Sequence, residues 1–187
     1  MYLQHICEQE DFDILKKHIL KYGSHSDEKG GYKEITAVIT MAPISITRLF
    51  GTFCNENNTT PAFLIEGISN VISGCSDYTS IPGSEYYKDD YIERVKCFSR
   101  YLEDHELGHR TARQFVYHAD ETGCFHSFQF LPKEGTLLVD FRSCDLIHKF
   151  IPDVLMLLLL CEKYNLHINK FELVFGSLHI YDKDVER

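Results

Sequence analysis

The chain has 187 residues, 44% of them hydrophobic and 25% charged, which predicts one globular domain over residues 1–187 with a sizeable core. A formal net charge of −9 and a pI near 5.5 argue against a protein that follows nucleic-acid phosphates with a basic face. Seven cysteines without a Cys-x-x-Cys pair argue against a zinc knuckle and a disulfide framework, and favour reduced thiols in a cytoplasm.

The N-terminal segment shows no targeting signal. Met1–His5 contains no basic stretch followed by an apolar one. The longest apolar run, 154–161, is far shorter than the roughly 20 residues of a membrane span. We therefore expect a cytoplasmic protein that is neither secreted nor inserted in a membrane.

The first part of the chain predicts helices separated by loops and a strand. Apolar residues recur at helical spacing over Asp11–Tyr22, and a loop over 23–31 follows this amphipathic helix. β-branched residues over Ile35–Ile46 predict a strand. A loop over 55–61 ends in a proline that can open a helix over Ala62–Ile72.

The second part of the chain is richer in strands. Residues 73–90 predict an irregular loop that helps to form a site, and Tyr91–Asp104 has helical spacing again. Three strands are then expected, over Arg113–Tyr117, Cys124–Leu131 and Thr136–Phe141, with Pro132–Gly135 as the hairpin turn between the last two. A helix over Pro152–Tyr164 and a final strand over Phe171–Tyr181 follow. This mixture predicts an α+β fold.

Three segments of the second half carry a joint pattern. They read GCFHSFQF over 123–130, FRSCD over 141–145 and FGSLHIY over 175–181. In order and spacing they resemble the thymidylate synthase family, in which a Pro-Cys-His stretch leads into Phe-Gln-Phe. A hairpin, Gln-Arg-Ser-x-Asp, a long helix and a Gly-Asp-x-His-x-Tyr strand follow in that family. The resemblance is carried by residues 110–181.

The resemblance implies a fold, a reaction and partners. The fold is a single thymidylate synthase-like α+β domain, with a mixed β-sheet packed with helices. The reaction is the transfer of a one-carbon unit to C5 of a pyrimidine nucleoside monophosphate, with 5,10-methylenetetrahydrofolate as the carbon donor. The family builds its site across two subunits, so a homodimer is implied.

The resemblance also assigns the catalytic and phosphate-binding residues. Cys124 would be the thiolate that adds to C6 of the pyrimidine, and such a thiol needs help to ionise. Arg142 and Ser143 would bind the nucleotide phosphate, for which a guanidinium fork is well suited. Arg110 would reach the phosphate bound by the partner subunit. Glu66, in an apolar helix segment, would be a partly buried carboxyl that relays protons.

The remaining assignments concern the sugar and the base. His179 and Tyr181, two apart on a strand, share a face and would bind the sugar hydroxyl. Asp145 and Asp153 are assigned to the base. Asp153 occupies the position at which thymidylate synthases read uracil with asparagine and cytidylate hydroxymethylases read cytosine with aspartate; a gap in the alignment would place Lys149 there instead.

The sequence leaves three functions open. A cytidylate (CMP or dCMP) 5-hydroxymethyltransferase is favoured by Asp153, and also by the lack of any tryptophan to shelter a methylene intermediate from water. A thymidylate synthase acting on dUMP would need Lys149 or another residue to read the base. A non-catalytic nucleotide-binding relative is suggested by the few residues that follow Tyr181.

Structural alternatives stand beside these roles. Cys124 can be a small core residue, and Arg142 can simply pair with Asp145. Asp153 can be an acid placed for the helix dipole. Glu66 can be a solvated helix residue, and His179 an ordinary strand residue.

Overall fold

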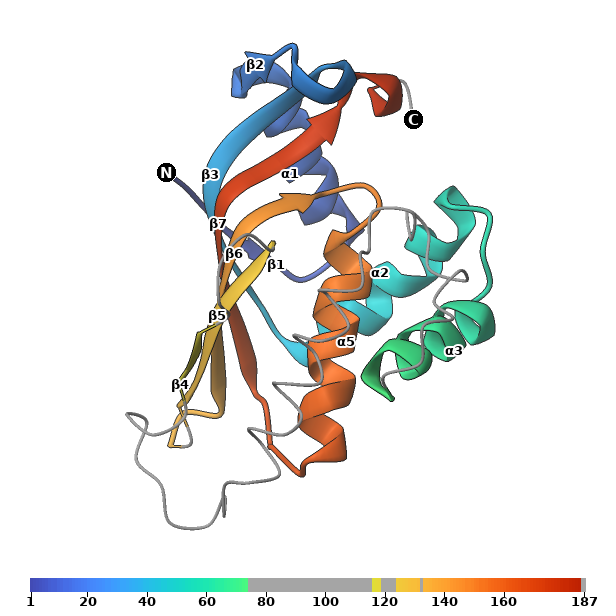
Figure 1. Ribbon diagram of the computed structural model, residues 1–187, viewed down its shortest axis with the longest axis vertical. Helices are drawn as coiled ribbons and strands as arrows, with labels where there is room; N and C mark the ends of the chain where they lie inside the picture. Colours follow the sequence, from blue (N-terminus) through green and yellow to red (C-terminus); the bar gives the residue numbers. More distant parts are fainter. Residues whose placement is uncertain (74–115, 119–123, 132, 186–187) are drawn as a thin grey trace.

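The last strand, β7 (Lys170–Tyr181), lies in the middle of the sheet rather than at its edge (Figure 1). The computed structural model describes residues 1–73, 116–118, 124–131 and 133–185. Within them the sheet order is β1-β3-β7-β6-β5-β4, with β2 paired to β3. The other strands are β1 (Tyr2–Ile6), β2 (Ser24–Ser26), β3 (Tyr32–Met41), β4 (Val116–His118), β5 (Phe125–Leu131) and β6 (Thr136–Asp145).

The sheet is mixed in direction. β1 runs parallel to β3, and β6 runs parallel to β7, whereas β3–β7, β5–β6, β4–β5 and β2–β3 are antiparallel. A parallel connection requires a crossover, and α5 (Phe150–Lys163) supplies it between β6 and β7. The described residues thus form one α+β domain with a mixed sheet, which confirms the expected α+β class.

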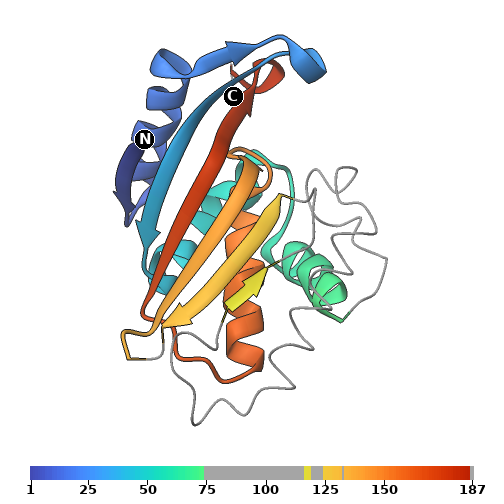
Figure 2. The same cartoon turned by 60° about the vertical axis from the view of Figure 1, so that its left-hand side comes forward.

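The helices cover one face of the sheet (Figure 2). They are α1 (Gln9–Tyr22), α2 (Pro43–Glu56), α3 (Pro61–Ile72) and α5, with 3-10 turns η1 (Glu28–Gly30) and η5 (Asp182–Asp184). α5 packs against both α2 and α3. It is buried on nearly all sides because its apolar run lies between the sheet and these outer helices.

Aromatic side chains join α5 to the central strands. The rings of Phe141 on β6 and Phe175 on β7 stack with centroids 5.0 Å apart, and Phe150 of α5 lies 5.8 Å from Phe175. All three side chains are almost fully buried. Each such burial contributes about 2 kcal/mol, so this cluster fixes the start of α5 against the ends of β6 and β7.

Several expected elements differ from the structure. The strand expected over 35–46 begins at Tyr32, ends at Met41 and gives way to α2, because Pro43 can occupy the first turn of a helix. The loop expected over 23–31 contains β2 and η1, and β1 was not expected at all. β6 extends to Asp145, so the Arg-Ser-Cys-Asp motif lies within a strand. The helix expected over 91–104 and most of the loop expected over 73–90 lie outside the described residues.

Candidate functional site

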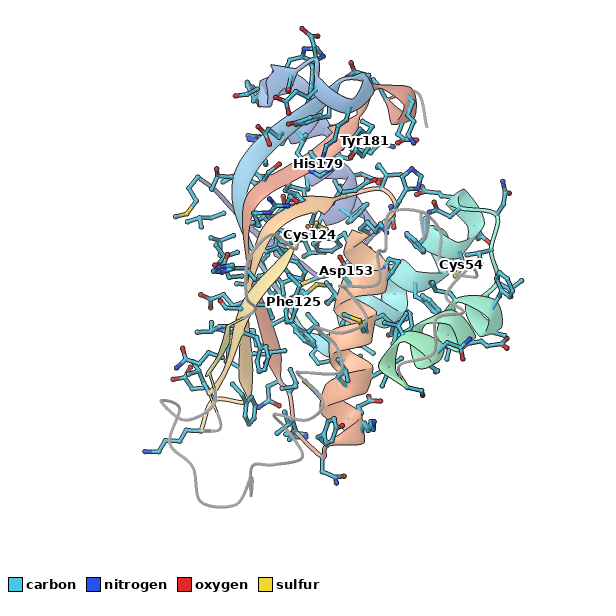
Figure 3. All side chains as sticks on the ribbon, viewed as in Figure 1. Cys54, Cys124, Phe125, Asp153, His179 and Tyr181 are labelled. Atoms are coloured by element: carbon cyan, nitrogen blue, oxygen red, sulfur yellow. The ribbon has the colours of Figure 1, made fainter. Side chains whose placement is uncertain are left out.

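Residues from four distant segments meet where β6 and β7 end (Figure 3). In the parallel β6–β7 pair, Ser143 is opposite Ser177 and Asp145 is opposite His179. On the other side of β7, Glu34 of β3 is opposite His179. Residues paired in register have neighbouring side chains, so this end of the sheet carries a row of polar groups.

Cys124 lies immediately before β5 and is exposed. Its Sγ is 3.3 Å from Ser143 Oγ, and its carbonyl accepts a 2.7 Å hydrogen bond from Arg142 N. The three residues expected to act on the nucleotide and its phosphate are therefore adjacent. An exposed thiol can reach a substrate, so Cys124 is not a core cysteine.

Gly176 allows the two strands to approach each other at this point. A Cβ at Gly176 would lie 2.8 Å from Arg142 O, and the Gly176 carbonyl accepts a 3.2 Å hydrogen bond from Thr36 Oγ1. The β3–β7 register also shifts here, between Ile35 and Ala37. A residue larger than glycine would push β7 away from the backbone that supports Arg142.

Two buried carboxylates flank a half-buried lysine at the start of α5. Asp145 is 5% exposed and Asp153 is 4% exposed. Lys149 N donates to Asp145 O at 3.0 Å, and Asp153 N donates to Lys149 O at 2.9 Å, which places the three residues at successive turns. Asp153 and Cys124 both act electrostatically on Lys149, so the three residues lie in one region of the structure.

The charges in this group influence one another. Burial lowers the pKa of Lys149 to about 8, and the negative charges of Asp153, Asp145, Cys144 and Cys124 oppose that decrease. Burial, and then the charges of Asp153 and Asp145, raise the pKa of Cys144 well above its ordinary value. Cys144 is therefore a poor nucleophile, whereas Cys124 is exposed and close to a cation.

One carboxylate oxygen of Asp145 is available to accept a hydrogen bond. Its Oδ1 accepts backbone hydrogen bonds from Ile147 N at 2.9 Å and His148 N at 3.3 Å. Its Oδ2 is buried and has no hydrogen-bond partner among the described residues. No Arg142–Asp145 ion pair occurs in this part of the chain, so the simple pairing of these two residues is not what the structure shows. A buried unpaired oxygen is a suitable acceptor for a ligand N–H.

His179 is half-buried in a cluster of three rings with Tyr32 and Tyr181. The rings of Tyr32 and Tyr181 lie 5.4 Å and 5.1 Å from its ring. Burial lowers the pKa of His179, while the charges of Asp145 and Glu34 oppose this shift. The imidazole is therefore favoured in its neutral form, which can accept a hydrogen bond.

Two expected site residues do not join this group. Glu66 is exposed on α3, so the expectation of a partly buried carboxyl is wrong; α3 buries Leu64, Gly67 and Ile68 instead. Arg110 lies outside the described residues. Among the residues that the structure does describe, no cluster of three or more His, Cys, Asp or Glu side chains could hold a metal ion.

Sequence reasoning missed three residues of the site. Glu34 and Tyr32 come from β3, and Ser177 lies between two recognised motif positions. The sequence suggested Lys149 only as an alternative to Asp153 for reading the base, yet both residues belong to the same charged group at the start of α5. The missing signal was strand pairing, since Glu34 is 145 positions from its register partner His179 and no local pattern links them.

Comparisons with known proteins identify no relative of the chain. Neither the protein-family models nor the curated proteins contain a match to the chain. Within the described ranges, no helix combines the length and the apolar character needed to cross a membrane.

Proposed function

We propose that the chain has a thymidylate synthase-like fold and transfers a one-carbon unit to C5 of a pyrimidine nucleoside monophosphate, as a cytidylate 5-hydroxymethyltransferase. The observation that carries the proposal is the exposed thiol of Cys124, 3.3 Å from Ser143 Oγ and hydrogen-bonded through its carbonyl to Arg142 N. Lys149 feels the charges of both Asp153 and Cys124, so the residues that the resemblance assigns to one pyrimidine ring lie in the same region.

The proposed chemistry begins at Cys124. Its thiolate adds to C6 of the pyrimidine, and the electron pair of the C5–C6 double bond makes C5 a nucleophile. Once C5 holds the one-carbon unit, loss of the C5 proton would break the bond to the carbon donor, which leaves, and would give an exocyclic methylene. Water then adds to this methylene as the Cys124–C6 bond breaks, which gives the hydroxymethyl group and frees Cys124 as a thiolate.

Folate fits one feature of the site. Methylenetetrahydrofolate would supply carbon at the oxidation level of formaldehyde. Asp145 Oδ2 is the buried, unpaired acceptor that could hold an N–H of a heterocycle. This oxygen supports a bound ring beside Cys124.

The proposed preference for cytosine over uracil depends on Asp153 and Lys149 at the start of α5. A carboxylate at Asp153 accepts a hydrogen bond from the 4-amino group of cytosine, whereas uracil presents an oxygen there that repels it. Lys149 is the competing candidate, because an ammonium can donate to O4 of uracil. Thymidylate synthesis from dUMP is therefore the second function that this group of residues supports.

One face of the sheet carries none of the described helices, and this supports a homodimer. The helices lie on the opposite face (Figures 1 and 2). Val38 of β3 is opposite Val174 of β7, and both are only partly buried. Leu3 of β1, opposite Val38, is 67% exposed. A second copy of the chain would cover these apolar side chains.

Release of tritium from C5-labelled CMP, dCMP and dUMP, with and without methylenetetrahydrofolate, tests the reaction. The proposal expects release from a cytidylate, its loss in Cys124→Ser, and its retention in Cys7→Ser, which removes a thiol from the β1–α1 connection. Release from dUMP alone would establish the synthase. No release from any nucleotide by a folded protein that still binds them would refute catalysis and leave a binding protein.

A further inference from the structure

A line of polar side chains crosses from β3 to β7 beside the site. Ser177 Oγ donates a short hydrogen bond to Glu34 Oε2. The same Oγ lies 3.5 Å from His179 Nδ1. Glu34 is also the register partner of His179, so the carboxylate, the hydroxyl and the imidazole form one chain.

The direction of these hydrogen bonds follows from what each group can offer. An ionised Glu34 can only accept, so the single hydroxyl proton of Ser177 must point to Glu34. The lone pairs of Ser177 Oγ then face His179 Nδ1, which must carry the imidazole proton. The other ring nitrogen, Nε2, is left as an acceptor in the neutral imidazole.

We propose that Glu34 is a positioning residue that acts through Ser177 to hold His179 with its proton on Nδ1, so that Nε2 accepts a hydrogen bond from a sugar hydroxyl of the bound nucleotide. The sugar as ligand rests on the proposed function, whereas the state of the imidazole does not. Because Nε2 can then only accept a hydrogen bond, the site favours a nucleotide with a hydroxyl at this position over one that has no donor there. Glu34 thereby sets the specificity of the site for a hydroxyl at this position.

The charges around His179 are compatible with a neutral ring. Burial is the largest effect and lowers its pKa, as does Lys29 in the turn before β3. Asp145 of β6, a hydrogen bond with the Ser177 backbone and Glu34 of β3 raise it. The net decrease favours the uncharged imidazole, and only the uncharged ring has an acceptor nitrogen. The rings of Tyr32 and Tyr181 pack against the imidazole.

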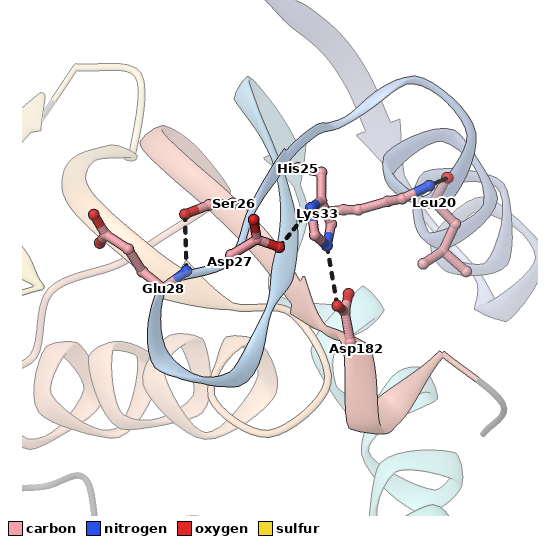
Figure 4. Close-up of polar contacts among 7 residues, drawn as sticks. All are labelled: Leu20, His25, Ser26, Asp27, Glu28, Lys33 and Asp182. Atoms are coloured by element: carbon pink, nitrogen blue, oxygen red, sulfur yellow. Dashed lines mark hydrogen bonds and ion pairs between the residues drawn. The ribbon is translucent and has the colours of Figure 1, made fainter.

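The two strands are anchored on both sides of this chain of hydrogen bonds (Figure 4). Lys33, next to Glu34, donates from Nζ to Leu20 O of α1 at 2.6 Å. His25 of β2 lies 3.0 Å from Asp182 Oδ2, which follows directly after β7. These links hold the start of β3 against the end of β7, so the Glu34–Ser177 contact does not depend on the side chains alone.

NMR of the imidazole nitrogens tests the positioning without any ligand. We expect an Nδ1–H tautomer at His179 in the wild-type protein, and its loss in Ser177→Ala and in Glu34→Met. Glu34→Gln retains an acceptor oxygen, so it should keep the tautomer while lowering the pH at which His179 protonates, because the charge that raises its pKa is gone. Glu172→Met is the control, because it makes the same change at a glutamate of β7 that is not part of this chain of hydrogen bonds. An Nε2–H tautomer in the wild type, or an unchanged one in Glu34→Met, overturns the proposal.

A second measurement connects the tautomer to the ligand. Binding of dCMP is compared with that of 2′,3′-dideoxycytidine monophosphate, which lacks the 3′-hydroxyl. Wild type and Glu34→Gln should prefer dCMP about 10-fold, the value of one hydrogen bond of about 1.4 kcal/mol, and Glu34→Met should bind both equally. Equal binding by the wild type overturns the role of the hydroxyl. If neither nucleotide binds, the proposed function and the sugar ligand both fail, while the NMR result still decides whether Glu34 positions His179.

Discussion

Replacing Lys149 should change how the stability of the protein depends on pH. The pKa of this lysine falls from 10.5 to about 8 on folding, so burial of its charge costs about 3 kcal/mol at neutral pH. Between about pH 8 and about pH 10.5 the unfolded chain binds more protons at this residue than the folded one, and stability therefore rises with pH through that window. The cost is fully present below the folded-state pKa and disappears above the unfolded one.

Urea denaturation of wild type and Lys149→Met measures this effect. The free energy of unfolding of wild type minus that of the variant should rise by about 2 kcal/mol between about pH 7 and about pH 9.5. Taking the difference removes the titration of other groups common to both proteins. Lys163→Met replaces an exposed lysine in the last turn of the same helix, and its difference should stay flat. A flat or falling difference for Lys149→Met would refute the assignment of a buried ammonium at this site.

Three further substitutions probe the frame of the site by urea denaturation. Gly176→Ala should lower the free energy of unfolding by about 1–3 kcal/mol, because its Cβ would lie 2.8 Å from Arg142 O. His148→Ala should lower it by about 1–2 kcal/mol, because it removes the imidazole nitrogen 3.1 Å from the buried carboxylate of Asp184 and the 2.9 Å hydrogen bond to Asn57 Oδ1. Thr60→Ala should lower it by about 1 kcal/mol, because the hydroxyl no longer caps the first turn of α3.

Two control variants separate these effects from general destabilisation. Gly51→Ala adds a Cβ within α2 where no other atom lies within 4 Å, so it should stabilise the protein by about 0.5–1 kcal/mol. His25→Ala removes an exposed partner of Asp182 and should cost less than about 1 kcal/mol. A loss at Gly51 equal to that at Gly176 would show that the close approach of β6 and β7 is not the cause.

Local patterns in the sequence were enough for several elements. Helical spacing of apolar residues predicted α1, and proline followed by an apolar segment predicted α3. The strands on either side of the expected hairpin turn were also found, with the start of β6 at Thr136 and the end of β5 at Leu131 as expected, because a turn between two alternating segments fixes its own neighbours. The α+β class follows from these elements, since it requires only their types and order.

Local patterns gave wrong predictions where a short segment is compatible with more than one structure. The β-branched residues of 35–46 continue past Met41, so periodicity alone did not show that Pro43 starts α2. Glu66 looked partly buried because its neighbours are apolar, yet α3 turns it outward. The period of a helix determines which residues share a face, but not which face the protein covers.

The sequence by itself determined the local elements and, through the resemblance, a set of candidate residues that included Cys124, Asp153 and His179. Tertiary structure decided which of them meet: β6 brings Ser143 to Cys124, and β3 brings Glu34 to His179. It also placed Lys149 where burial lowers its pKa. The physical reason is that spacing along the chain encodes local periodicity, whereas contacts between distant segments depend on strand register and on the burial of a shared core.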